Sequence, residues 1–289
     1  MVLAALTGYV PTDRQILVLR GRDASDYLHR VLTCNVKNLK PGHSTSGALL
    51  TGQGKLIAPL HLCAEPGGSF RLVVAEGAAE ALQMRLERYI FTEDVQVEPV
   101  DALVTELIGD WPRFAPLPAR NAYRDFDLDG ETVRLVTLAD DRFWLISRRP
   151  PADLGEPLGE VQYTAWRIAR GIPAWGHELD DGVIPLRLGI DDAFDHQKGC
   201  YTGQEVISRA NFVGHPPHEL LGVRARGPLA PASELTLDGD YVGVVTSSVF
   251  DEASGESIGL ARLRWHKAKP GEQVRTDALV VEIVALPLD

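Results

Sequence analysis

Cysteine is scarce in this sequence, with three among 289 residues. Cys34, Cys63 and Cys200 are odd in number and widely spaced, which excludes a disulfide framework and a local CxxC metal site. Cys34 and Cys63 lie within apolar helix and strand patterns, so we expect both in the core. Cys200 lies in a glycine-rich segment and needs a separate explanation.

Long hydrophobic runs are also missing. No stretch of about 18 apolar residues occurs, as a membrane-spanning helix would need. The N-terminal segment Met1–Leu6 lacks the basic leader and apolar core of a signal peptide. These observations predict a cytoplasmic protein with no membrane partner.

Positive charge is in deficit. The 29 Lys and Arg residues against 40 Asp and Glu residues give a formal net charge of −11. Non-specific nucleic-acid binding depends on clustered Lys and Arg, so we expect no direct nucleic-acid partner, although a local basic patch stays open. The 45% hydrophobic content supports a sizeable core, and the length suggests two domains or three.

Metal and nucleotide motifs are absent as well. The eight histidines form no H-x-x-x-H or HExxH pair, so we expect no metal site. The glycines near residue 50 match neither a P-loop nor a dinucleotide fingerprint; they are Gly42, Gly47, Gly52 and Gly54.

Helix and hairpin patterns alternate along the first 170 residues without βαβ regularity. Helices are predicted over 23–32, 78–90 and 159–170, the last with Val161 on its apolar face. Hairpins are predicted from strands 56–62 and 70–74, and from 132–138 and 143–147. The fold class predicted is α+β.

Beyond Gly214 only short strand-like pieces remain, which predicts a β-barrel of about 70 residues. We therefore place domains at 1–213 and 214–289, the first with two lobes and an α+β lobe within about 45–155. The predicted barrel strands are 220–224, 235–237, 241–246, 258–263 and 279–286.

Lys198 to Glu205, KGCYTGQE, is the most unusual segment. Thr202 and Glu205 fit a capping box for the helix that follows, in which case Cys200 is simply a small buried residue. Alternatively, the helix N-terminus and Lys198 both favour the Cys200 thiolate, the reactive form. His196 is the nearest candidate base, and both interpretations stay open at this point.

The octapeptide resembles the signature K-G-C-Y-x-G-Q-E of the YgfZ family. These folate-binding proteins support iron-sulfur cluster assembly or repair and are related to the glycine-cleavage aminomethyltransferase, T-protein. The resemblance covers nearly the whole chain and is lowest over 95–155. The other similar segments are 35–42, 48–55, 171–179, 242–247 and 258–261.

The resemblance implies a GcvT/YgfZ-like multi-lobed folate-binding fold with a C-terminal β-barrel, and tetrahydrofolate or a one-carbon derivative as cofactor. Glu178 matches the pterin-recognising position, where a carboxylate accepts two parallel N–H bonds; otherwise it is a solvated loop residue. Trp175 and Tyr201 are candidates to stack on the pterin or to pack in the core. Arg209 is a candidate for the folate glutamate tail. Gln204 and Glu205 complete the predicted folate site.

The candidate catalytic residues are Cys200 and Lys198, from the thiolate interpretation above, and Asp101, from the resemblance. Asp101 falls near the position of the T-protein catalytic carboxylate, although Ile108-Gly109-Asp110 replaces the Q-G-P expected there. The first hypothesis is a folate-binding factor that serves iron-sulfur proteins, including tRNA-modifying enzymes. The second is a folate-dependent aminomethyl or methyl transferase, and the third is a binding module with no chemistry.

Overall fold

The computed structural model describes residues 6–128 and 130–288, so most of Met1–Leu6 lies outside the described residues. The chain divides into two compact units, one formed by 6–158 with 192–204 and the other by 159–191 with 205–288. This grouping differs from the predicted boundary near Gly214. The reason is that the helix α3 (Glu160–Ala169) packs against two strands of the C-terminal barrel.

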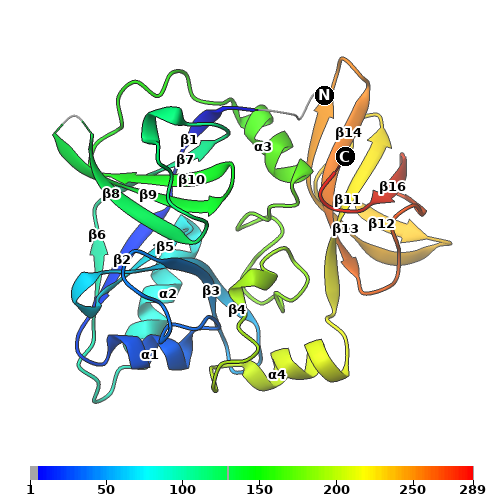
Figure 1. Ribbon diagram of the computed structural model, residues 1–289. Helices are drawn as coiled ribbons and strands as arrows, with labels where there is room; N and C mark the ends of the chain where they lie inside the picture. Colours follow the sequence, from blue (N-terminus) through cyan, green and yellow to red (C-terminus); the bar gives the residue numbers. More distant parts are fainter. Residues whose placement is uncertain (1–5, 129, 289) are drawn as a thin grey trace. The chain divides into compact units, whose positions relative to one another are not determined.

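The first unit contains two five-stranded antiparallel sheets (Figure 1). One sheet runs in the order β3 (Ser44–Leu50), β4 (Leu56–Ala64), β5 (Phe70–Val74), β2 (Gln15–Arg20) and β6 (Gln96–Val100). The other runs in the order β1 (Gly8–Thr12), β7 (Leu103–Ile108), β10 (Arg142–Ser147), β9 (Glu131–Ala139) and β8 (Ala122–Leu128). Both predicted hairpins are confirmed, as β4 with β5 and β9 with β10.

Helices α1 (Ala24–Val31) and α2 (Glu76–Arg88) belong to the same unit, close to their predicted positions. Helix α2 packs against β2, β4 and β6. The Tyr27 hydroxyl on α1 donates a hydrogen bond to the Leu86 carbonyl on α2, at 2.5 Å, and so ties the two helices together.

The core of the first unit is formed where the two sheets face each other. Alternate residues of a strand point to opposite faces, so every second apolar residue enters this layer. Cys63 lies in it and Cys34 is also buried, which confirms the prediction for both. Burial raises the pKa of each thiol to about 12. The other members of the cluster are Ile16, Val18, Val73, Val104, Val136, Trp144 and Ile146.

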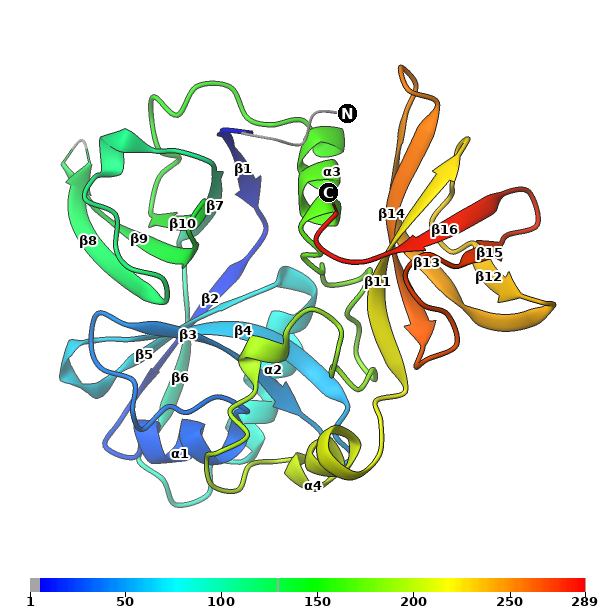
Figure 2. The same ribbon diagram turned by 45° about the vertical axis from the view of Figure 1, so that its right-hand side comes forward.

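The second unit contains a closed six-stranded barrel (Figure 2). Its strands are β11 (His218–Arg226), β14 (Glu256–Arg264), β13 (Asp240–Asp251), β12 (Glu234–Leu237), β15 (Gln273–Arg275) and β16 (Val280–Val284). The predicted strands are all present, but β15 was missed because three residues are too few to show a period of two. The α+β class is confirmed.

Helix α3 departs from the prediction at its N-terminal end. Val161 is 63% exposed, whereas Ala165 and Ile168, predicted on the same face, are buried together with Trp166 and Arg167. Position 167 therefore places a guanidinium inside the second unit. Within the described residues, none of the helices combines the length and hydrophobicity that crossing a membrane requires.

Candidate functional site

The segment 192–204, which carries most of the octapeptide, is anchored in the first unit by buried polar contacts. The Thr33 hydroxyl donates to the Ala193 carbonyl at 2.6 Å, and the Asp195 amide donates to the Thr33 carbonyl at 3.1 Å. Asp195 in turn accepts hydrogen bonds from the amides of Gln197 and Lys198. These hydrogen bonds fix the segment to Thr33, which lies two residues after the end of α1.

Lys198 continues this anchoring, because its ammonium group lies at the C-terminal end of α1. Nζ donates to the carbonyls of His29, Leu32 and Cys34 at 2.5, 2.6 and 2.8 Å. The last carbonyls of a helix have no partner within the helix, and a cation satisfies them well. All three N–H donors are therefore engaged by the last turn of α1 and the residues that follow it. Burial lowers the Lys198 pKa to about 8.

Gly203 is required by both its conformation and its surroundings. Its φ is +83°, and a Cβ built there would lie 2.5 Å from the Thr51 carbonyl oxygen and 3.1 Å from the Gly54 Cα. Only glycine tolerates such a conformation and such an approach at low cost. Two segments that resemble the YgfZ family, 48–55 and 198–205, thus meet at this glycine. A Cβ built at Gly199, by contrast, would have no neighbouring atom within 4 Å.

The predicted capping box does not form. Helix α4 (Gln204–Ser208) begins after Gly203 and continues as a short π-helix, Arg209–Val213. The Glu205 carboxylate instead pairs with the Arg209 guanidinium at 2.9 Å, and both side chains are mostly exposed. Two of the predicted folate contacts, Glu205 and Arg209, therefore bind each other. The side chain of Gln204 is half-buried.

Cys200 is exposed, unlike the other two cysteines. Three residues, 201–203, separate it from α4, so it does not directly precede the helix. The ring of His196 stacks on Phe194, with centroids 6.3 Å apart.

Tyr201 is buried next to this exposed cysteine. Its hydroxyl has no hydrogen-bond partner among the described residues, and the Lys198 Nζ lies 5.3 Å from the ring centroid. Burial raises the Tyr201 pKa to about 12, so the hydroxyl keeps its proton and can donate it in a hydrogen bond. A buried hydroxyl without a partner is costly and marks a place for a ligand or water.

Glu178, in the second unit, has a fully buried carboxylate. Oε2 accepts from Arg167 Nη1 at 3.0 Å and from the Ala174 amide at 2.9 Å. Oε1 accepts from the hydroxyls of Thr246 and Ser247 at 2.8 and 2.6 Å. Arg167 Nη2 also donates to Ser247 Oγ at 2.5 Å, which closes the network. A solvated loop glutamate is therefore excluded.

A register shift in β13 explains how two consecutive hydroxyls reach one oxygen. Neighbouring residues of a regular strand point to opposite faces, but the pairing of β13 with β14 shifts between Val245 and Ser247. The Thr246 hydroxyl also lies 3.1 Å from the Leu260 carbonyl, so it has an alternative acceptor. Oε1 of Glu178 could thus release one donor without leaving that donor unpaired.

The remaining predicted residues lie elsewhere. Trp175 is half-buried and forms an isolated β-bridge with Leu179 in the second unit. Asp101 is exposed between β6 and β7, at a cavity that does not include Cys200. Cys200 is therefore not part of the cavity at which Asp101 lies. Within the described residues, no cluster of His, Cys, Asp and Glu could hold a metal ion.

No family model matches the chain. An aminomethyltransferase of Geobacillus kaustophilus is 25% identical, over 94% of this chain and 84% of its own. The iron-sulfur cluster assembly factor IBA57, mitochondrial, of Mus musculus is 27% identical, over 96% and 83%. The tRNA-modifying protein YgfZ of Vibrio atlanticus is 23% identical, over 72% and 67%.

The chain is a relative of the aminomethyltransferases, IBA57 and YgfZ. The fold agrees, since the crystal structure of the glycine cleavage system aminomethyltransferase T from Bartonella henselae superposes with a TM-score of 0.84 at 20% identity. That comparison covers 98% of this chain and 86% of the other. The YgfZ and aminomethyltransferase resemblance drawn from the sequence is confirmed, as is the GcvT-like fold.

Arg167, the buried partner of Glu178, is the one residue of this network that the sequence did not single out. A basic residue near the C-terminal end of a helix ordinarily interacts with the helix dipole, and the sequence alone gives Arg167 no other role. Arg167 lies in a stretch that is buried throughout, from Ala165 to Ala169, and no spacing in the sequence marks it as the partner of Glu178.

Proposed function

We propose that this protein binds tetrahydrofolate and supports iron-sulfur cluster assembly or repair, with Cys200 as its reactive residue. The observation that carries the proposal is the complete octapeptide KGCYTGQE with Cys200 exposed within it, in a relative of IBA57 and YgfZ. The proposed partners are iron-sulfur proteins, including tRNA-modifying enzymes, and the proposed compartment is the cytoplasm.

The residues present give partial support for a folate. The unpartnered Tyr201 hydroxyl can hydrogen-bond a polar ligand atom. The Glu178 carboxylate already accepts four hydrogen bonds, of which the one from the Thr246 hydroxyl has an alternative acceptor. Binding at Glu178 would need the Thr246 hydroxyl to turn to Leu260. Tetrahydrofolate, when bound, supplies a nitrogen pair that carries a one-carbon group. The chain itself supplies the orienting hydrogen bonds.

The folate arm is tested by titrating reduced and oxidised folates into the wild type and Glu178→Gln, with Glu205→Gln as the control. We expect tetrahydrofolate to bind the wild type and Glu178→Gln to bind at least about tenfold more weakly, a loss of about 1.4 kcal/mol. Denaturation curves must show that Glu178→Gln is folded. Failure of the wild type to bind any folate would overturn this arm.

The cysteine arm is tested by alkylation and by complementation. Native protein treated with iodoacetamide should be modified at Cys200 alone, because Cys34 and Cys63 are buried with pKa values near 12. Cys200→Ser should fold and bind folate but fail to restore iron-sulfur enzyme activity in cells that lack the native protein. Undiminished rescue by Cys200→Ser would remove the reactive role.

A folate-dependent aminomethyl or methyl transferase is the second candidate, favoured by the relationship to the aminomethyltransferases. Its catalytic carboxylate would be Asp101. Turnover of tetrahydrofolate to a methylene or methyl form, with a sharp fall in Asp101→Asn, would support it. No turnover with any glycine-cleavage donor would exclude it.

A further inference from the structure

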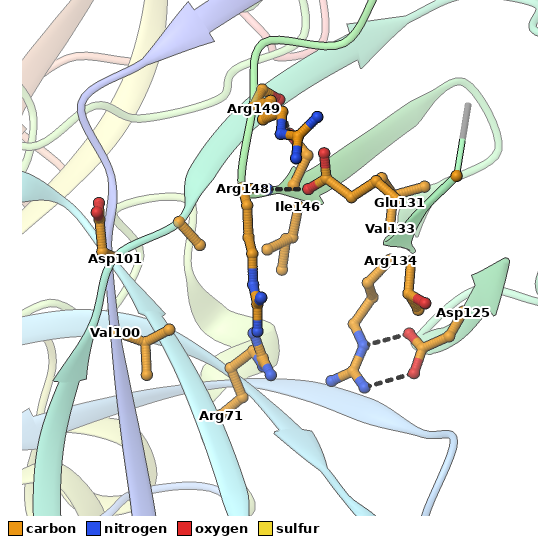
Figure 3. Close-up of a pocket in the computed structure, with 14 residues that line it drawn as sticks. Arg71, Val100, Asp101, Asp125, Glu131, Val133, Arg134, Ile146, Arg148 and Arg149 are labelled. Carbon is orange, nitrogen blue, oxygen red and sulfur yellow. Dashed lines mark hydrogen bonds and ion pairs between the residues drawn. The ribbon is translucent and has the colours of Figure 1, made fainter. Parts of the chain in front are cut away.

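A cavity of about 450 Å³ lies between the two sheets of the first unit (Figure 3). All of its lining residues belong to 6–158, so the site is complete within that unit. Three of the residues that line it are apolar, Val100, Val133 and Ile146. Ligand pockets of about 300–1,000 Å³ usually combine apolar residues with a few convergent polar groups.

The charged groups at the cavity are four arginines and three carboxylates, in a chain whose formal charge is −11. Arg134 is the buried support of the site, since its guanidinium holds both oxygens of Asp125 at 2.6 and 2.8 Å and contacts Glu65 at 2.5 Å. Its donors are therefore largely occupied. The other three are Arg71, Arg148 and Arg149.

These three arginines retain free guanidinium donors. Arg71 uses only Nε, which donates to Glu65 at 2.8 Å. The guanidinium groups of Arg148 and Arg149 have no partner among the described residues. Figure 3 shows the Arg148 side chain extended toward Arg71, so two like charges converge in the cavity. Such convergence is unfavourable unless an anion lies between them.

Three carboxylates also line the cavity; they are Asp101, Asp125 and Glu131. Among the described residues, none of them forms an ion pair with the Arg148 or Arg149 guanidinium. Asp125 is held by Arg134, and Glu131 accepts a hydrogen bond from the backbone amide of Arg148. Asp101 has no partner among the described residues, and its carboxylate is directed away from the Arg148 guanidinium (Figure 3). The Arg148 and Arg149 guanidinium groups are therefore the two positive charges at the cavity that have no carboxylate partner among the described residues.

We propose that this cavity binds a small polyanion, a di- or tricarboxylate or a phosphate compound, through Arg71, Arg148 and Arg149. Planar guanidinium groups bind carboxylate and phosphate oxygens in pairs, and three of them match a ligand with two or more negative charges. Arg134 positions the site through Asp125 and Glu65 and makes no contact with the anion. The proposal does not depend on folate binding.

The test is calorimetric titration of the full chain with citrate and, separately, with inorganic phosphate, at about 10 mM salt, where screening is weak. We expect saturable binding of at least one of them, and binding that weakens as NaCl is added. Binding of citrate alone identifies carboxylates, and binding of phosphate alone identifies phosphate compounds. Acetate, with a single charge, should bind at least about tenfold more weakly than the better probe.

Arg148→Gln combined with Arg149→Gln should weaken that binding at least about tenfold. Both side chains are exposed, so the double variant should unfold at the same denaturant concentration as the wild type. Arg88→Gln removes an exposed arginine on α2 and should leave binding unchanged. Glu178→Gln should also leave it unchanged, which separates this site from the folate proposal. Absence of saturable binding by both anions, or wild-type affinity in the double variant, would overturn the proposal.

Discussion

The Glu178 carboxylate is held by four hydrogen bonds, from donors that lie as far apart in the chain as Ala174 and Ser247. A buried ion pair adds little when it is complete, but a single remaining partner is an uncompensated charge in a medium of low dielectric constant. Arg167 and Glu178 must therefore be considered as one unit.

Arg167→Met should lower the free energy of unfolding by about 3–5 kcal/mol, because it leaves the Glu178 carboxylate buried without its cation. Urea unfolding followed by circular dichroism measures this. Arg226→Met, at an exposed arginine of the barrel, should change it by less than about 0.5 kcal/mol. A loss below about 1 kcal/mol in Arg167→Met would mean that the carboxylate finds other partners.

A second single residue, His61, makes the free energy of unfolding depend on pH. Its ring lies edge-on to Trp144, with centroids 5.5 Å apart, and burial, followed by Arg142 and Arg14, lowers its pKa to about 3. In the unfolded chain the group binds a proton near pH 6.5, so between pH 6.5 and 3 the unfolded state holds more protons. Stability from this group is complete above pH 6.5 and is lost as the pH falls toward 3.

His61→Leu should therefore flatten the fall in stability between pH 6.5 and 3, a fall worth roughly 4 kcal/mol for this group. Urea midpoints measured across that range give the slope. His43→Leu, at an exposed histidine, should keep the wild-type slope. Equal slopes in the wild type and His61→Leu would show that His61 titrates normally in the folded state.

At the scale of the element, the octapeptide acts as an anchored loop. Lys198 binds the end of α1, Gly203 packs against the Thr51–Gly54 turn, and Cys200 is exposed between these two fixed points. The local pattern predicted a helix cap at Thr202, but the helix begins later because Gly203 takes a left-handed conformation.

Gly203→Ala should destabilise the protein by at least about 2 kcal/mol, because it adds the strain of a positive φ to a clash with the Thr51 carbonyl. Gly199→Ala is the matched control in the same loop and should change stability by less than about 1 kcal/mol. Thermal unfolding and the native alkylation rate of Cys200 measure both variants. Equal stability in the two would mean that the turn moves aside at little cost.

At the scale of the whole molecule, the charge of −11 disfavours compaction through self-repulsion. Raising NaCl from about 10 to about 150 mM shortens the Debye length from about 30 to about 8 Å. We expect the midpoint of thermal unfolding to rise by about 2–4 °C, equivalent to about 1 kcal/mol. A fall in the midpoint would show that attractive ion pairs outweigh the net repulsion.

Local patterns were sufficient for much of the fold. The hairpins β4–β5 and β9–β10, the helices α1 to α3 and the burial of Cys34 and Cys63 follow from periodicity, turn residues and composition, which act between near neighbours in the chain. Predictions from periodicity failed at two places. Strand β15 is too short to show a period of two, and Val161, predicted on the apolar face of α3, faces solvent.

Residue order alone also identified the octapeptide, the Glu178 segment and the relationship to YgfZ and the aminomethyltransferases. Tertiary contacts decided how these residues are used: the Lys198 ammonium binds α1, Arg167 pairs with Glu178, and arginines of β5, β9 and the end of β10 converge on one cavity. Each contact joins residues that are not neighbours in the chain, and burial sets its strength. No local pattern of residues carries that information.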